Sequence, residues 1–189
     1  MTTGRHRALT ALVVTASALL CAIPPGAAQG AAPGEYEVKA AFLYNFARYV
    51  EWPSGGDAPS EDPFVIVILG EDPFGTAIDE TLRGKTLGER AVVIRRAAQA
   101  DDIGGCDILF IGDSEHRDLP RILDLFEGTP TLTVADMEEF AERGGVIRFR
   151  MEGARIRLDI NRTAAQRAGL RVSSELLKLA RIVGRPPGD

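Results

Sequence analysis

The run FVIVIL, from Phe64 to Leu69, is a continuous series of apolar and mostly β-branched side chains that Gly70 closes. Runs of this kind are typical of strands that are buried on both faces of a sheet. Three further short strands are predicted along the chain, at Ala91 to Ile94, Asp107 to Ile111 and Thr131 to Val134. Because turns and helical segments alternate with these strands, the pattern predicts right-handed crossovers and a mostly parallel sheet.

Beyond Gly144 and Gly145, apolar residues alternate with charged residues on both sides of a turn at Glu152 and Gly153. This alternation predicts a β-hairpin with one polar face. The expected fold class is therefore α/β: a three-layer, mostly parallel, Rossmann-like sheet with flanking helices and this C-terminal β-hairpin at the sheet edge.

Helical periodicity is clearest in EYEVKAAFLYNFARYVEWP, from Glu35 to Pro53, where apolar residues recur at spacings of three and four. Pro53 is expected to end this first helix. A second helix is predicted to begin with Asp72 as its cap and Pro73 at its first position. Further helices are expected over 117–128, 137–145, 162–168 and 173–183, with Asn161 capping the third of these and Ser173 or Ser174 the last.

The residues before the first helix are typical of an export signal. Arg5 and Arg7 form a basic start, an apolar stretch follows over 8–23, and Ala27 and Ala28 are small residues suited to signal peptidase. The apolar stretch is shorter than the roughly 20 residues that a membrane-spanning helix needs. We expect a cleavable signal peptide over 1–28, a short linker over 29–34, a single domain over 35–183 and a disordered tail over 184–189. The mature chain is then periplasmic and has no transmembrane segment.

Charge and cysteine content narrow the classes of partner. Cleavage after Ala28 removes two arginines and no acidic residue, so the net charge goes from −5 to −7. An acidic protein without a basic run is not expected to bind nucleic acid. Cys106 is the one cysteine left after cleavage, so no internal disulfide is expected, and an intermolecular bridge remains an alternative to a buried, inert thiol.

No catalytic constellation, metal site or cofactor site is predicted. A phosphoacceptor domain is the sharpest enzymatic alternative, because Glu71 and Asp72 follow the first strand and Asp113 follows the third. The chain lacks the Ser or Thr that should follow the fourth strand and the Lys that should come later, so Asp72 and Asp113 are better interpreted as helix caps. His116 is the one histidine outside the signal, which excludes multi-histidine metal sites.

Two groups of residues are candidates for a partner-binding surface. Exposed aromatic side chains anchor many protein contacts, and the candidates are Tyr44, Tyr49 and Trp52. Tyr49 is expected to share a helix face with Phe42 and Phe46, which we interpret as core, whereas Tyr44 and Trp52 point elsewhere. The second group occupies alternate positions on the two strands of the hairpin, and we call it the arginine face: Arg148, Arg150, Arg155 and Arg157. It is expected to hold a carboxylate or an acidic partner, although charged residues also protect sheet edges from unwanted pairing.

A small-molecule receptor is the alternative function. In open α/β sheets ligands bind in crevices outside the carboxyl ends of the strands. Here that crevice would be formed by residues that follow the predicted strands, namely Gly70, Asp72, Gly112, Asp113 and Asp136. An amino acid or a vitamin-like compound is the expected kind of ligand.

Several blocks, in order, resemble the YfiR-like family of exported bacterial proteins over about Glu35 to Val183. They are KAAFLYNFARYVEWP, VILGEDPFG, CDILFIG, LTVADMEEFAERGGVIRF and RIRLDINRTAAQRAGLRVSSELLKLARIV. The resemblance implies a periplasmic, non-catalytic regulator that binds the periplasmic domain of an inner-membrane diguanylate cyclase, which lowers cyclic di-GMP and biofilm formation. It also implies release by an outer-membrane lipoprotein, and a homodimer is left open.

The chain differs from the family pattern at one place. Members of this family often have Cys-His before Ile-Leu-Phe and further cysteines in internal disulfides, whereas here Asp107 follows Cys106 and no partner cysteine exists in the mature chain. Redox control of folding is therefore not expected for this protein.

Overall fold

The structure is a computed structural model that describes residues 34–53 and 62–184. The predicted signal peptide, nearly all of the linker and all of the tail but Gly184 lie outside the described residues, as does most of the predicted loop after Pro53. These domain boundaries stay predictions.

The strands of the main sheet are β2 (Phe64–Leu69), β3 (Thr86–Leu87), β4 (Arg90–Ala97), β5 (Ile108–Ile111), β6 (Leu132–Ala135), β7 (Ile147–Glu152), β8 (Arg155–Asn161) and β10 (Ala180–Val183). Within the described residues they lie in the order β10-β8-β7-β6-β5-β2-β4-β3. From β7 to β4 every neighbouring pair is parallel, as is β8 with β10. The two antiparallel pairs are β7 with β8 and β3 with β4, so the mostly parallel sheet is confirmed.

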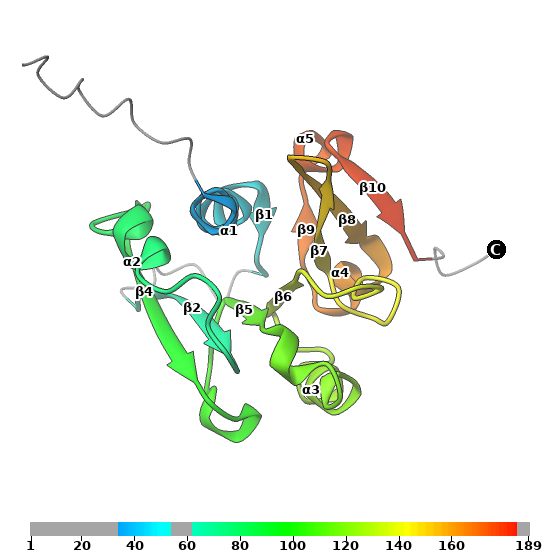
Figure 1. The fold of residues 1–189 in the computed structure, drawn as a ribbon, viewed down its shortest axis with the longest axis horizontal. Coiled ribbons are helices and arrows are strands. Elements are labelled where there is room, and N and C mark those ends of the chain that lie inside the picture. The colour runs from blue at the N-terminus through cyan, green and yellow to red at the C-terminus, as the bar shows by residue number, and fades with distance from the viewer. Residues whose placement is uncertain (1–33, 54–61, 185–189) are drawn as a thin grey trace, which may run out of the picture. The chain divides into compact units, whose positions relative to one another are not determined.

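The helices are α1 (Glu35–Tyr49), α2 (Ala77–Leu82), α3 (Leu119–Leu125), α4 (Arg162–Arg167) and α5 (Ser174–Lys178). Alternate strand residues build two cores, one on each face of the sheet. Ile66 and Phe110 pack in the core that includes α1, α2, α4 and α5, whereas Val67 and Leu109 pack in the core that includes α3. Figure 1 shows α1 and α3 on opposite sides of β5 and β6. The three-layer α/β architecture is therefore confirmed.

The first helix contributes most of its apolar stripe to the sheet. Leu43 and Phe46 are fully buried, and the Phe46 ring stacks on Phe149 of β7 at 5.6 Å between centroids. Phe42 is half-buried against the same ring, so the interpretation of both phenylalanines as core is confirmed. The helix ends at Tyr49 and not at Pro53, because Val50 is extended and begins β1 (Val50–Glu51), which pairs antiparallel with β9 (Arg171–Val172).

The predicted hairpin exists, but its place at the sheet edge was wrong. β7 and β8 pair antiparallel over six residue pairs, and β10 then adds to the outer side of β8. The segment 173–183 was expected to be one helix, yet α5 ends at Lys178 and Ala180–Val183 is a strand. The open edge of β8 offers backbone hydrogen bonds to this segment, and Ile182 and Val183 are β-branched residues that favour a strand.

Two other predicted helices differ from the structure. Residues 137–145 form turns, with Glu139 at a φ of 56°, and this backbone conformation is incompatible with a regular helix. Asp72 accepts a hydrogen bond from the backbone N–H of Phe74 at 2.7 Å, which makes a turn, and α2 begins only at Ala77. The predicted caps at Asn161 and Ser173 are confirmed, since their side chains accept from the backbone N–H groups of Ala164 and Leu176.

The contact of Phe46 with Phe149 should be a large contribution to stability. We expect Phe46→Ala to lower the free energy of unfolding by about 3–5 kcal/mol, because it leaves a cavity in a fully buried position. Tyr49→Ala is the matched control, since Tyr49 is exposed on the same helix. Urea denaturation of both variants measures the difference, and equal losses would contradict this description of the core.

Candidate functional site

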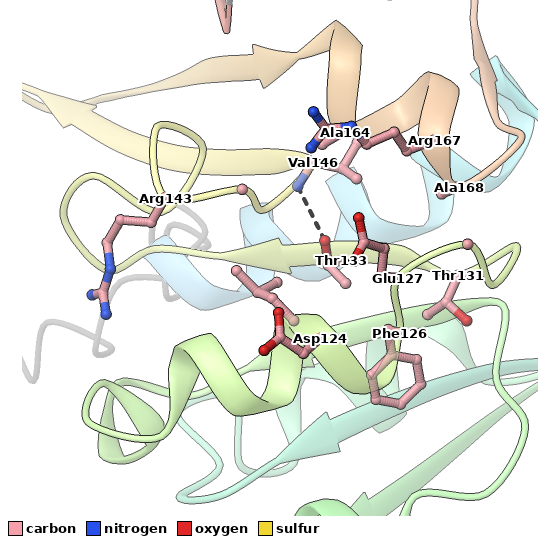
Figure 2. A pocket seen from close by; sticks show the side chains of 13 residues that line it. Asp124, Phe126, Glu127, Thr131, Thr133, Arg143, Val146, Ala164, Arg167 and Ala168 are labelled. Carbon is pink, nitrogen blue, oxygen red and sulfur yellow. Dashed lines mark hydrogen bonds between the residues drawn. The ribbon is translucent and has the colours of Figure 1, made fainter.

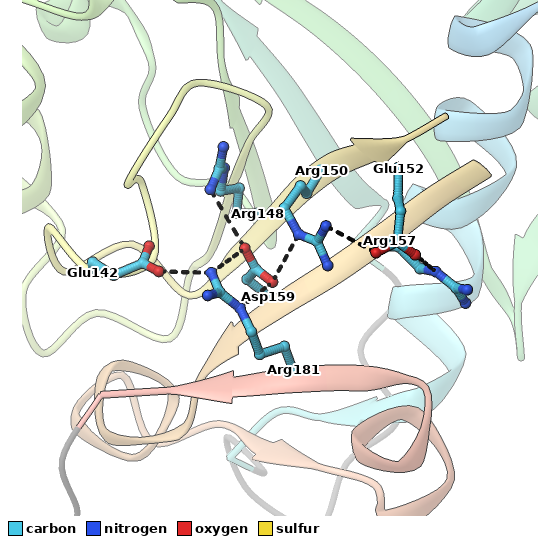
Figure 3. Close-up of polar contacts among 7 residues, drawn as sticks. All are labelled: Glu142, Arg148, Arg150, Glu152, Arg157, Asp159 and Arg181. Atoms are coloured by element: carbon cyan, nitrogen blue, oxygen red, sulfur yellow. Dashed lines mark hydrogen bonds and ion pairs between the residues drawn. The ribbon is translucent and has the colours of Figure 1, made fainter. Parts of the chain in front are cut away.

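The strands β7, β8 and β10 bring charged side chains together around Asp159, whose side chain is fully buried. The antiparallel register places Arg148 opposite Asp159 and Arg150 opposite Arg157, and the parallel register places Arg181 beside Asp159. Asp159 accepts from Arg181 Nε at 2.9 Å and from its second terminal nitrogen at 2.8 Å. Arg148 and Arg150 each approach the same carboxylate at 3.5 Å (Figure 3).

The charge of Asp159 is stabilised by these arginines. Burial by itself would raise the pKa of the Asp159 carboxyl, but the hydrogen bonds and the charge of Arg181, together with the charges of Arg150 and Arg148, outweigh burial. The pKa of Asp159 is therefore held below its usual value. A buried carboxylate that holds three cations fixes the relative positions of three strands.

The four residues of the predicted arginine face lie on one face of the hairpin, as their alternation required. Arg157 donates to Glu152 at 2.8 Å, and its charge holds the pKa of Glu152 below the usual range. Arg155 is exposed and has no ion pair among the described residues. The Nε atoms of Arg148 and Arg150 are buried without a hydrogen-bond acceptor in the described part of the protein. Neither Nε atom is accessible from outside, and that of Arg150 is the atom that lies 3.5 Å from Asp159.

A cavity of about 450 Å³ lies beside β7, and we call it the β7 cavity. Glu35 and Lys39 of α1 form one side, Asp136 and Glu138 after β6 form another, and β7 closes it from Arg148 to Met151. The cavity exists because β6 ends at Ala135, which pairs with Arg148, whereas β7 continues to Glu152.

Lys39 is the functional-site residue that the sequence analysis missed. Its side chain is 2% exposed, and its Nζ donates to Asp136 and contacts Glu35, both at 2.5 Å. Burial alone would lower the pKa of this ammonium group, but the hydrogen bonds to Asp136 and Glu35 outweigh burial and raise the pKa. The available signal was a lysine four residues before Leu43, on the apolar side of the helix.

Tyr36 completes this charged group. Its hydroxyl donates to Asp136 at 3.0 Å, and the ammonium of Lys39 lies 4.3 Å from the centre of its ring. Burial first, and the nearby charge of Asp136 second, raise the pKa of the Tyr36 hydroxyl. Asp136 was a predicted crevice residue, and the structure places it at the β7 cavity, joined to two side chains of α1.

Two of the aromatic candidates, Tyr44 and Trp52, lie on the other side of the sheet from the arginine face. Tyr44 is half-buried and donates to the backbone carbonyl of Thr86 at 2.9 Å. Trp52 packs edge-to-face on Phe64 with 5.2 Å between centroids, and Tyr49 is 37% exposed. Because Tyr44 and Trp52 contact the core that contains Phe149, and the arginines alternate with Phe149, the structure does not join these two aromatic residues and the arginine face in one surface.

The predicted crevice at the carboxyl ends of the strands is filled at its centre. A Cβ added to Gly70 would lie 2.3 Å from Ser114 Oγ, and one added to Gly112 would lie 2.6 Å from a backbone oxygen. Asp72 is held by Arg96 at 2.7 Å. Open space remains at the flanks, because Asp113 lines a separate shallow cavity and Asp136 lines the β7 cavity.

A further pocket, at the amino end of β6, was not predicted, and we call it the amino-end pocket. Its volume is about 180 Å³, and it lies between α3, the start of β7 and α4 (Figure 2). Asp124, Glu127 and Arg167 line it with ionisable side chains, whereas the guanidinium group of Arg143, which also lines it, is bound to His116 at 3.3 Å and points away (Figure 2). Since four separate segments form this pocket, no local pattern in the sequence could have indicated it.

Other kinds of site receive little support. Among the described residues there is no group of three or more His, Cys, Asp or Glu side chains placed to hold a metal ion. Cys106 is a free thiol, and burial raises its pKa to about 12, which disfavours the reactive thiolate. None of the described helices has the length and apolar character to cross a membrane.

These features define an α/β domain with a charged face on its C-terminal hairpin and a cavity beside it. The sequence profile of the YfiR/HmsC-like family matches residues 36–181, so the chain belongs to that family. This match confirms the resemblance found in the sequence.

Two solved structures are similar in fold. One is a conserved domain protein from Vibrio cholerae O1 biovar El Tor, with a TM-score of 0.53, 10% identity and 79% of this chain covered. The other is the ABC domain in complex with L-Trp from Streptococcus pneumoniae, with a TM-score of 0.52, 10% identity and 78% covered. This chain spans 60% of the length of each. At such identity the similarity concerns the fold alone.

The Asp159 contacts predict a pH-dependent stability. Because the pKa of Asp159 is lower in the folded chain than its ordinary 3.8, its stabilisation is present above that value and is lost as the pH falls through the folded pKa. We expect Asp159→Asn to cost about 3–5 kcal/mol at pH 7, since three arginines lose their shared anion, and to flatten the acid side of the stability curve.

Asp101→Asn is the matched control, because Asp101 pairs with Arg121 on the surface. Chemical denaturation of both variants at a series of pH values from neutral to acid gives the comparison. Equal stability of the two variants at pH 7 would contradict the role of Asp159.

Proposed function

We propose that this protein is an exported, non-catalytic regulator that binds the periplasmic domain of a membrane-bound diguanylate cyclase and restrains it. The observation that supports this most directly is the family match over residues 36–181, because the family resemblance implies that role. The predicted export signal fits the same compartment. Restraint of the cyclase lowers cyclic di-GMP and biofilm formation, and an outer-membrane lipoprotein that sequesters the regulator relieves it.

The arginine face is the surface that we assign to the partner. It combines the exposed groups of Arg155 and Arg157 with the partly exposed charges of Arg148 and Arg150, on a protein whose net charge is negative. Such a face selects an acidic partner through electrostatic complementarity. Its rigid frame, fixed by Asp159, keeps the guanidinium groups in place before binding, which reduces the entropic cost of association.

The mechanism is a shift of population. A protein that binds the inactive arrangement of the cyclase more tightly than the active one lowers the active fraction without any bond being made or broken. A tenfold difference in affinity corresponds to about 1.4 kcal/mol, so a few charged contacts are sufficient.

Deletion of the gene should raise cyclic di-GMP and surface attachment in cells that express the cyclase. Complementation with Arg155→Glu should restore repression poorly, because a negative charge then faces an acidic partner. Arg83→Glu is the matched control, since Arg83 is exposed at the end of α2. This helix follows β2, which β5 and β6 separate from the hairpin strand β7 in the sheet. The measurements are the intracellular nucleotide level and the amount of attached cells.

An unchanged nucleotide level in the deletion strain, with the cyclase present, would contradict the proposed function. If Arg155→Glu and Arg83→Glu repress equally well, the regulatory function stands, but the assignment of the arginine face as the contact surface is wrong.

A small-molecule receptor is the second candidate function, and the amino-end pocket is the observation that favours it. The carboxylates of Asp124 and Glu127 and the guanidinium group of Arg167 on one pocket are suited to the ammonium and carboxylate groups of an amino acid. The function would then be to sense a compound outside the inner membrane, and occupancy could tune the affinity for the cyclase.

A thermal-shift screen tests this second function. With amino acids, L-Trp included, and vitamin-like compounds at millimolar concentration, a receptor should gain a few degrees in Tm with at least one compound. Arg167→Gln should abolish that gain, whereas Arg83→Gln should retain it. A screen in which no compound raises Tm would count against the receptor.

A further inference from the structure

The strand β7 has an open edge on the side of the β7 cavity. Its register with β6 contains only Val134 with Ile147 and Ala135 with Arg148. From Phe149 to Glu152, β7 keeps β8 on its other side but has no strand neighbour on the β6 side in the described part of the protein. Sheet edges of this kind present unpaired backbone donors and acceptors.

The direction of the backbone groups follows from one hydrogen bond. The carbonyl of Val146 accepts from the backbone N–H of Asn161 on β8 at 2.9 Å. Backbone groups alternate in direction along a strand, so those of Arg148 and Arg150 point to β8 and those of Phe149 and Met151 point to the β6 side. Beyond the end of β6, the N–H and C=O of Met151 therefore face the cavity.

The two faces of this edge differ in chemistry. On one face, Phe149 is buried and Met151 is 42% exposed, so an apolar surface reaches the open edge. On the other face lie Arg148 and Arg150, whose side chains are 13% and 30% exposed. Asp159 accepts its short hydrogen bonds from Arg181 and makes only 3.5 Å contacts with these two arginines.

The carboxylates near the cavity are already engaged for the most part. Asp136 and Glu35 are both bound to the ammonium of Lys39, and Asp136 also accepts from Tyr36. Glu138 is exposed at the rim. This edge therefore offers an acidic segment the positive charges of Arg148 and Arg150, which share the one carboxylate of Asp159 with Arg181, together with the backbone groups of Met151.

We propose that the partner adds a short extended segment to the open edge of β7, with acidic side chains on the Arg148 and Arg150 face and apolar side chains toward Phe149 and Met151. This rests on the proposed function, since the segment belongs to the regulated partner. Strand addition gives affinity through main-chain hydrogen bonds and specificity through alternate side chains. A segment that alternates acidic and apolar residues satisfies both faces at once.

A peptide experiment tests the geometry with the purified mature chain. The probe is a fluorescent hexapeptide that alternates glutamate and valine. One control alternates lysine and valine, and a second is the glutamate peptide with every backbone amide N-methylated, which keeps the charges and removes the donors. We expect the glutamate peptide to bind at least about tenfold more tightly than either control, and to slow amide hydrogen exchange at Met151.

The protein variants give an independent comparison. Arg148→Gln combined with Arg150→Gln should weaken binding of the glutamate peptide about tenfold, whereas Arg83→Gln should bind it as the parent chain does. Strand addition is overturned if the N-methylated peptide binds equally well, if the lysine peptide binds equally well, or if the glutamate peptide does not bind.

A cellular comparison separates this inference from the proposed function. Met151→Pro removes the N–H that faces the cavity, and Met151→Ala retains it. Thermal unfolding first establishes whether the Met151→Pro variant is folded. If it is folded and represses as well as Met151→Ala, while the deletion raises cyclic di-GMP, strand addition fails and the proposed function stands. If Met151→Pro is unfolded, the double arginine variant answers the same question. If the deletion has no effect, the proposed function fails, and with it the assignment of the segment to that partner.

Discussion

The buried carboxylate of Asp159 is the constraint on which the C-terminal half of the structure depends. It lies on the central strand of β7, β8 and β10 and binds a guanidinium group from each neighbour (Figure 3). A charge that is fully removed from water must keep its partners, so this residue fixes the registers of three strands. The same requirement draws Ala180–Val183 into the sheet and fills the edge that the hairpin would otherwise present.

The difference in length between β6 and β7 produces the candidate site. Since β6 ends at Ala135 and β7 runs on to Glu152, a cavity opens where a parallel neighbour would lie. The first helix reaches the same place, and Lys39 crosses the apolar layer to bind Asp136. One end of the sheet thus collects a buried cation, two partly exposed arginines and a strand edge without a neighbour, although the residues come from segments about 100 positions apart.

Sequence patterns predicted the parts of the fold that rest on local chemistry. The β-branched run FVIVIL is typical of a strand buried on both faces, and the alternation around Glu152 is typical of a hairpin. The prediction failed for SSELLKLARIV, because its apolar residues fit a helix as well as a short helix followed by a strand, and the open edge of β8 decided between them. It failed also for MEEFAERGG, where the chain must turn from β6 back into β7 and takes a positive φ at Glu139.

The sequence by itself determined the α/β class, the family and the alternation that places the arginine face, because burial and period are properties of neighbouring residues. Only the tertiary structure decided that Tyr44 and Trp52 lie on the other side of the sheet from the arginines, that neighbouring atoms crowd Gly70 and Gly112, and that Lys39 is buried. These facts depend on the order and length of the strands and on ion pairs between residues far apart in the sequence, such as Lys39 with Asp136. The spacing of neighbouring residues does not determine any of them.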